Sequence, residues 1–155
     1  MAWTTPKTDW ETGELIAASD INAVNENMAA LKNPASAVYT TTERISTTSR
    51  TFADVDSNNL NLTITTTGGD VLVQFSGTVN HDSGAKGYYD VEIDGTRQGG
   101  DDGIRQDNPD IVVVAFAHLF QNMSAGTHTF KLQWRTNTGT LHIEPYSQFW
   151  VREIS

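Results

Sequence analysis

The sequence predicts an antiparallel all-β sandwich or barrel that is preceded by one short helix. Three observations lead to this prediction. Within residues 39–155, apolar and polar side chains alternate with a period of two in several short segments, which is typical of strands with one face on a core. Turn signals containing glycine or asparagine separate these segments. Residues 1–34 lack the alternation, so the chain divides near Pro34 into two unlike parts.

The first part divides again, into an extended segment of residues 1–18 and a helical segment of residues 19–34. Residues 1–18 contain Trp3, Pro6 and Trp10 and show no periodicity. A segment this short cannot bury two indole rings by itself. We therefore expect it to dock on another protein, and the alternatives are a loose terminus or a terminus that folds back on its own subunit.

The helix is expected over residues 20–32. Ser19 is a suitable N-cap, Asp20 suits the positive end of the helix dipole, and Pro34 ends the helix. The apolar positions follow the a and d spacing of two heptads: Ile21, Val24, Met28 and Leu31. This narrow stripe favours a coiled-coil seam, and a helix packed on its own domain is the alternative. Two heptads do not hold a coiled coil alone, so another part of the chain has to bring the copies together.

Five segments show the strand alternation most clearly: residues 60–64, 71–79, 89–93, 128–134 and 141–143. Asp94-Gly95 follows the third of them and predicts a hairpin turn with positive φ. Many short strands at this spacing are typical of a sandwich or a barrel.

Residues 111–120 and 149–151 depart from the alternation because they are apolar on both faces. The outer face of a two-layer sandwich normally contacts water, so such strands need a second cover. We expect an interface between copies of the chain that contains Val114, Phe116, His118, Phe120 and Trp150. The alternative is a central strand that a loop or the helix covers. Such an interface would supply the clamp that the heptad seam requires, although the mixed a and d residues do not decide between two and three copies.

Composition excludes several classes of partner. The 155 residues include 10 lysines and arginines against 19 aspartates and glutamates, a formal net charge of -9. An acidic protein of this kind is a poor ligand for nucleic acid or for an anionic membrane surface. No apolar run approaches the ~20 residues of a membrane span, so we expect no membrane insertion, and no secretory signal is apparent. The absence of cysteine excludes disulfides and thiolate metal sites.

No motif indicates catalysis. The four histidines are not spaced as a zinc site, which needs three or four converging ligands. The Gly-x-Ser-x-Gly elbow of serine hydrolases is absent from the sequence. We therefore expect no enzyme activity, no catalytic residue, no cofactor and no bound metal.

Two polar loops are candidates for recognition at the distal end of the sandwich. Residues 99–110 contribute Asp101, Asp102, Arg105 and Asp107, and residues 80–87 contribute His81 and Asp82. The aspartates of the first loop suit calcium, but their spacing does not match an EF-hand, so a solvated surface loop is favoured. Residues of the types that bind sugars are also present: Tyr88, Asp90, Asn137 and Tyr146.

Several phrases of the sequence resemble a known group of proteins. The N-terminal phrases are Trp3-Thr4-Thr5-Pro6, Trp10-Glu11-Thr12-Gly13-Glu14-Leu15-Ile16 and Ala18-Ser19-Asp20-Ile21-Asn22, with Pro34 as the stop. The β phrases are residues 71–77, 89–95, 124–134 and 149–151. Together they resemble bacteriophage virion proteins such as short tail fibres, head fibres and capsid decoration proteins, whose β domains are jelly rolls related in shape to C1q and TNF-like trimers.

The resemblance implies an all-β antiparallel jelly-roll sandwich with an N-terminal extended segment and one short α-helix, which forms a trimeric coiled-coil stalk. It implies a homotrimeric structural protein on the surface of the virion. Its docking residues on capsid or tail components would be Trp3, Pro6, Trp10 and Leu15. The resemblance does not say whether the protein grips a capsid, builds a tail or binds a host receptor, and a host surface glycan or protein is one candidate ligand of the exposed β domain. Two alternatives stay open, namely a decoration protein that only cements the capsid and a monomeric carbohydrate-binding module.

Overall fold

The computed structural model describes residues 7, 9, 11–32, 34–82, 84–107 and 111–154, with the side chains of residues 29–32 outside that description. Within these ranges the chain forms one helix and twelve strands. They are α1 (Ala18–Lys32), β1 (Ser36–Thr40), β2 (Ile45–Thr47), β3 (Ala53–Asp54), β4 (Asn61–Thr66), β5 (Gly69–His81), β6 (Gly87–Ile93), β7 (Thr96–Arg97), β8 (Arg105–Gln106), β9 (Val112–Met123), β10 (Gly126–Thr136), β11 (Leu141–Ile143) and β12 (Gln148–Glu153).

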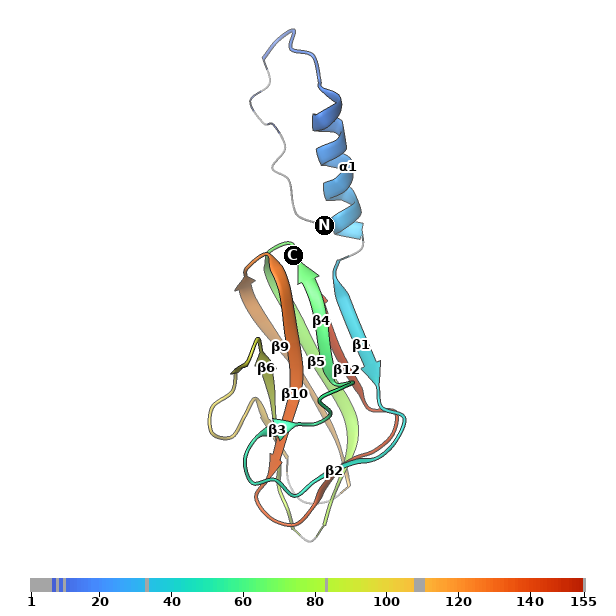
Figure 1. Ribbon diagram of the computed structural model, residues 1–155, viewed down its shortest axis with the longest axis vertical. Helices are drawn as coiled ribbons and strands as arrows, with labels where there is room; N and C mark the ends of the chain where they lie inside the picture. The colour runs from blue at the N-terminus through green and yellow to red at the C-terminus, as the bar shows by residue number, and fades with distance from the viewer. Residues whose placement is uncertain are drawn as a thin grey trace.

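The strands form two antiparallel sheets, which lie face to face below α1 in Figure 1. In the first, which we call the β5 sheet, β9 pairs with one edge of β5 and β12 and β11 pair in succession with the other edge. β1 lies outside β12, and β2 lies outside β11. In the second, the β10 sheet, β6 pairs with one edge of β10 and β3 and β4 pair with the other. The short strands β7 and β8 pair with the outer edge of β6.

The chain passes repeatedly from one sheet to the other. β4 belongs to the β10 sheet, β5 to the opposite sheet, β6 to the β10 sheet again, and β9 and β10 to opposite sheets. This order, with every pairing antiparallel, is that of a jelly roll. It confirms the predicted all-β antiparallel jelly-roll sandwich.

The predicted alternation places the core between the two sheets. The β5 sheet contributes Val71, Val73, Phe75, Val79, Val114, Leu141, Ile143, Phe149 and Val151, and the β10 sheet contributes Leu62, Ile64, Tyr89, Val91, Ile93, Phe130, Leu132 and Trp134. The rings of Phe75 and Tyr89 stack across the sandwich, with their centroids 6.1 Å apart. Side chains of the intervening positions point away from the core, so each sheet has an outer face.

The Asp94-Gly95 turn has the predicted geometry. It joins β6 to β7 with φ of 51 at Asp94 and 83 at Gly95, both in the left-handed region that a two-residue hairpin turn requires. This turn is therefore confirmed.

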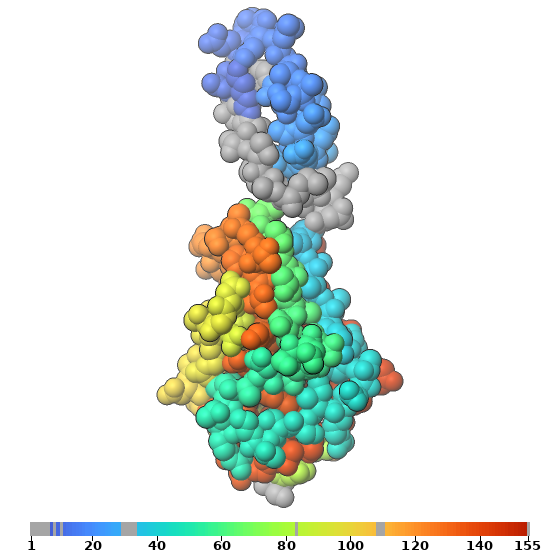
Figure 2. Space-filling model, in the orientation of Figure 1, coloured from blue at the N-terminus to red at the C-terminus, as the bar shows by residue number. Residues whose placement is uncertain are grey.

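The helix begins earlier than predicted. α1 starts at Ala18, and Ser19, the expected N-cap, lies inside the first turn. The Asp20 carboxylate accepts a hydrogen bond from the amide of Ala17 at 3.1 Å, which satisfies a donor at the helix start. α1 and residues 11–17 before it form an extension at one end of the β body (Figure 2). In the part of the chain that the structure describes, no helix has the length and apolar character needed to cross a membrane.

Candidate interaction surface on the outer face of the β5 sheet

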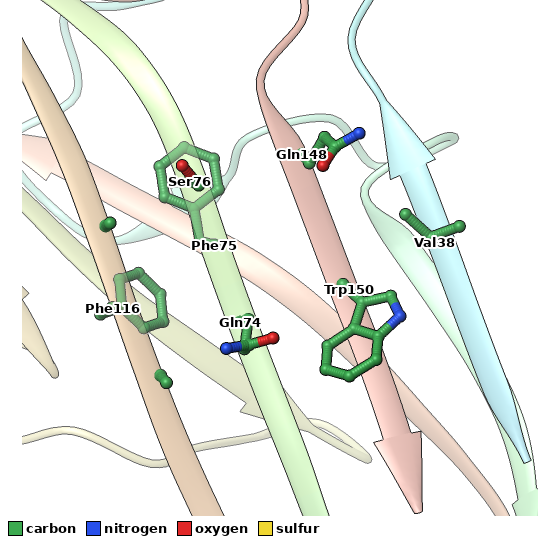
Figure 3. Close-up of a pocket in the computed structure, with 9 residues that line it drawn as sticks. Val38, Gln74, Phe75, Ser76, Phe116, Gln148 and Trp150 are labelled. Carbon is green, nitrogen blue, oxygen red and sulfur yellow. The ribbon is translucent and has the colours of Figure 1, made fainter. Parts of the chain in front are cut away.

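The strand register aligns four side chains in a row across the outer face of the β5 sheet. Val38 pairs with Trp150, Trp150 pairs with Gln74, and Gln74 pairs with Ala117. In Figure 3 the Trp150 indole lies between Val38 on β1 and Gln74 on β5. The row turns away from the core because the neighbours of Trp150 on β12, Phe149 and Val151, point inward and are fully buried.

This surface, which we call the outer apolar face, extends along β9. Val113 is 72% exposed and Val38 is 58% exposed, and Leu119 is exposed as well. Apart from Gln74, the part of this face beside the indole carries the small side chains of Ser76, Ala115 and Ala117. These small residues leave a groove of about 560 Å³ beside the large Trp150 ring.

The groove has no charged side chain among the described residues that line it: Val38, Gln74, Phe75, Ser76, Ala115, Phe116, Ala117, Gln148 and Trp150. Its polar side chains are neutral, and Gln148 Nε2 donates to Thr40 Oγ1 at 3.2 Å. In a chain with 29 charged side chains, 10 basic and 19 acidic, an uncharged groove of this size is suited to contact another protein surface, and the exposed Arg152 lies at its border on β12.

The four predicted interface residues of β9 lie on the side of the strand that faces the β10 sheet, opposite to the side that carries Trp150. Val114 is 1% exposed and belongs to the core of its own subunit. Phe116 packs on Phe75, with the ring centroids 5.9 Å apart, and His118 packs against Phe120 at 4.6 Å. These side chains point toward the β10 sheet, because each is paired with an inward-facing residue of β5. The prediction was therefore wrong for Val114. Phe116 and Phe120 are half-buried and His118 is exposed in the single chain, so an interface role for these three stays a prediction. Trp150 lies on the outer face.

The residues of β9 that accompany Trp150 are instead those of the opposite parity, namely Val113, Ala115, Ala117 and Leu119. Both sets are apolar, so the sequence contains no polar position that marks the outward face of this strand. Only the pairing of β9 with β5 distinguishes the two sets.

Three residues of the expected helical seam are exposed. Ile21, Val24 and Met28 are exposed on α1, and the side chain of Leu31 lies outside the described residues. The coiled coil stays a prediction. Of the expected docking residues, Leu15 is exposed, and Trp3, Pro6 and Trp10 lie outside the described residues.

The predicted recognition loops are only partly at the surface. Asp82, Asp101, Asp102 and Arg105 are exposed. Arg135 on β10 donates to the Asp101 carbonyl at 2.8 Å, so this part of the first loop lies beside the β10 sheet. His81 and Asp107, expected at the surface, are buried and hydrogen-bonded to each other. They are structural residues, because β5 continues to His81 and the chain after β8 turns into the sandwich.

The four histidines lie in separate places. His81 contacts Asp107, His128 contacts Asp94, and His142 contacts Asp82 and Ser46. Within the ranges that the structure describes, no three His, Asp or Glu side chains are placed to hold a metal ion.

The candidate sugar-binding residues do not form one site. Tyr88 lies under the Arg135 guanidinium, and Asp90 is fully buried. Asn137 accepts a hydrogen bond from the amide of Lys86, and Tyr146 is exposed in the turn between β11 and β12 with φ of 67. The structure therefore separates these four residues into two groups, of which the first belongs to the outer face of the β10 sheet.

No model of a known protein family matches the chain, and no curated protein matches it. Among solved structures, Eiger TNF from S. frugiperda is similar with a TM-score of 0.37 and 12% sequence identity, over 79% of this chain and 94% of that one. Dimeric latent PorU from Porphyromonas gingivalis has a TM-score of 0.37 and 10% identity, over 78% of this chain and 13% of that one. The assignment of the jelly roll rests on the strand order and register described above.

Proposed function

We propose that the chain is a structural protein of a bacteriophage virion, which assembles as a homotrimer and projects its β domain from the particle as a short fibre, spike or decoration. The observation that carries the proposal is the uncharged row across four strands: Val38, Trp150, Gln74 and Ala117. The centres of protein interfaces are depleted of charge and enriched in aromatic side chains. The outer apolar face has both properties.

The shape of the outer apolar face favours contact with a second copy of the chain. Trp150 and Val38 make a ridge, and the small residues around Ala117 make a hollow beside it. One copy can therefore seat its ridge in the hollow of the next. Such a contact joins two different parts of the face, so it is heterologous and forms a ring when it closes. Three copies make the smallest ring of this kind.

The helix supports the same arrangement. Ile21, Val24 and Met28 form an exposed apolar stripe with heptad spacing on α1. Copies arranged around one axis would bring their helices together beyond the end of the β bodies, where the stripes would bury one another. The β domains would then supply the clamp that two heptads need.

The virion assignment is supported by the resemblance of the N-terminal and β phrases to phage fibre and decoration proteins. In this proposal residues 1–18 dock on capsid or tail components, and the β domain contacts the host surface. A purely cementing role makes the same use of residues 1–18 and differs only in having no host ligand.

Light scattering on a sizing column tests the assembly. We expect the full chain to have a mass near three times 17.0 kDa at all concentrations. Ala117→Glu places a charge in the hollow and is expected to give a folded monomer. Thr63→Glu, an exposed substitution on the outer face of the β10 sheet, is the matched control and should stay trimeric. A monomeric wild-type chain would overturn the homotrimer.

Purified phage particles test the location. An antibody against the β domain should label particles produced with the full chain. Labelling should be lost when residues 1–18 are deleted, while the β domain remains folded by circular dichroism. Particles that carry none of the wild-type protein would overturn the virion assignment.

A further inference from the structure

We propose that a groove on the outer face of the β10 sheet binds a saccharide that carries a carboxylate. The groove has a volume of about 490 Å³, and its lining residues are Arg50, Thr51, Phe52, Glu92, Arg97, Asp101, Gln133 and Arg135. This inference rests on the proposed function, because it names the ligand class and the site through which the exposed β domain would contact a host surface.

Three of the six arginines of an acidic chain meet in this groove. Phe52 holds two of them, since the Arg97 and Arg135 guanidinium carbons lie 4.2 and 5.3 Å from the centre of its ring. Arg135 also lies 3.7 Å above the ring of Tyr88. Guanidinium groups stacked on aromatic rings keep their planes fixed, which suits bidentate binding of a carboxylate. Arg135 Nη2 already donates to the Asp101 carbonyl at 2.8 Å and lies 3.4 Å from Asp102 Oδ1, so the donors offered to a ligand are chiefly those of Arg97 and Arg50.

The positive charges are incompletely neutralised by the protein. Arg97 contacts the buried carboxylate of Asp90 through Nε at 3.4 Å, and among the described residues its two terminal nitrogens have no hydrogen-bond partner. Arg50 is exposed and forms no ion pair with any described residue. Burial raises the pKa of the Asp90 carboxyl, and the positive charge of Arg97 acts in the opposite direction by lowering it. The groove therefore offers donors to an anion without having to break a strong internal pair.

The other polar side chains of the groove favour a ligand with hydroxyl groups over a ligand with several negative charges. Glu92 and Asp101 line the same groove as the arginines, and Gln133 Nε2 donates to Glu92 Oε2 at 2.7 Å and to Asp54 Oδ1 at 3.0 Å. Carboxylate oxygens accept hydrogen bonds from hydroxyl groups but repel phosphate or sulfate chains. A ligand with one acidic group and several hydroxyls fits this mixture, and an acidic sugar is such a ligand.

The location of the groove is compatible with assembly. It lies on the β10 sheet, whereas the outer apolar face lies on the opposite layer of the sandwich. A homotrimer would thus keep three such grooves open. Weak binding at each groove would be reinforced by avidity on a surface that displays many copies of the sugar.

Titration by NMR of the full-length protein tests the proposal with four probes: methyl β-glucuronide, methyl α-N-acetylneuraminide, the neutral methyl β-glucoside and inorganic phosphate. We expect at least one acidic sugar to bind about tenfold more tightly than the glucoside, because one charge-assisted hydrogen bond changes the dissociation constant by about this factor. Arg97→Gln should abolish this preference. Arg50→Gln, at an exposed side chain without a partner, should weaken binding without affecting the fold. Arg44→Gln, which removes an exposed arginine paired with Glu144 outside the groove, is the control and should bind as the wild type.

Equal binding of acidic and neutral sugars would overturn the proposal. So would phosphate that binds as tightly as the acidic sugars, because the groove would then be an anion site only. Light scattering of the same samples separates the two proposals. A trimer without sugar binding contradicts this inference alone, and a monomer that binds the acidic sugar contradicts the homotrimer alone.

Discussion

His81 Nε2 lies 3.0 Å from Asp107 Oδ2 inside the sandwich, where the His81 side chain is fully buried. The same carboxylate accepts hydrogen bonds from the Tyr89 hydroxyl at 2.9 Å and from the Gly87 amide at 2.6 Å. Burial and then the charge of Asp107 raise the pKa of Tyr89, so the phenol stays protonated and donates. One carboxylate thus joins the end of β5, strand β6 and the chain after β8.

Replacing this carboxylate is expected to be strongly destabilising. Asp107→Asn keeps the shape but removes the charge and one acceptor oxygen, which leaves buried donors without partners. We expect the free energy of unfolding to fall by about 2–4 kcal/mol. Urea denaturation measures the change. Asp102→Asn, on an exposed side chain nearby, should change stability by less than about 0.5 kcal/mol. Equal effects of the two substitutions would contradict a structural role for Asp107.

The ion pair between His128 and Asp94 predicts a dependence of stability on pH. The hydrogen bond that His128 Nδ1 donates to Asp94 Oδ2, 2.7 Å away, raises the pKa of His128 above 6.5. The Thr129 amide, and then His128, lower the pKa of Asp94 below 3.8. The histidine contribution is complete below pH 6.5 and is lost as the pH rises through the folded pKa. The aspartate contribution is complete above pH 3.8 and is lost as the pH falls through the folded pKa. The pair therefore stabilises the fold most between these two values.

Asp94→Asn tests this dependence without disturbing the turn, because asparagine also accepts the left-handed φ of this position. We expect it to reduce stability more at pH 5.5 than at pH 8.5. The difference should stay below about 1 kcal/mol, since the Asp94 side chain is 47% exposed and screened by water. Glu43→Gln, at an exposed residue outside any such pair, should show no comparable difference. A loss that is the same at both pH values would exclude a contribution from the charged pair.

The sequence predicted those parts of the fold that local patterns determine. Alternation identified the core positions of β5, β6 and β10, and Asp94-Gly95 identified its turn. The outward face of β9 was not predictable, because Val113 and Val114 are identical side chains at adjacent positions. Their environments differ only through the register with β5.

The candidate sites were equally hard to predict, because pairing between distant strands decides which of their residues come together and which are buried. Asp101 and Asp107 have equal polarity in the sequence, yet one is exposed and the other is buried beside His81. The arginine groove combines Arg50, Arg97 and Arg135 from separate parts of the chain, which no spacing rule connects. Three residues singled out in the sequence pointed toward this face: Tyr88 and Asp90 as sugar-binding types, and Asp101 as a recognition residue.

Gly77 is expected to tolerate no side chain. A Cβ at this inward position of β5 would contact Ser147 Oγ, and it would lie 2.6 Å from Ser147 Cβ and 3.0 Å from Phe75 Cζ. Ser147 cannot easily move, because it is buried and its hydroxyl donates to the Glu144 carbonyl at 2.8 Å. Gly77→Ala should therefore lower the free energy of unfolding by about 1–3 kcal/mol. In Gly100→Ala, where a Cβ would meet open space, the effect should be neutral or slightly stabilising. A stabilising Gly77→Ala, measured by urea denaturation, would contradict the close approach.

The register of β9 predicts opposite outcomes for two adjacent valines. Val114 is 1% exposed in the core, so Val114→Asp buries an unpaired charge and should unfold the chain or destabilise it by more than about 4 kcal/mol. Val113 projects outward beside the outer apolar face, so Val113→Asp should leave the subunit folded. Its effect should be on association, because a charge at the edge of that face opposes contact with another copy. Circular dichroism and light scattering on both variants measure the two effects. Unfolding caused by Val113→Asp would show that Val113, and not Val114, faces the core. A trimeric Val113→Asp variant of full stability would show that the copies contact each other through another surface.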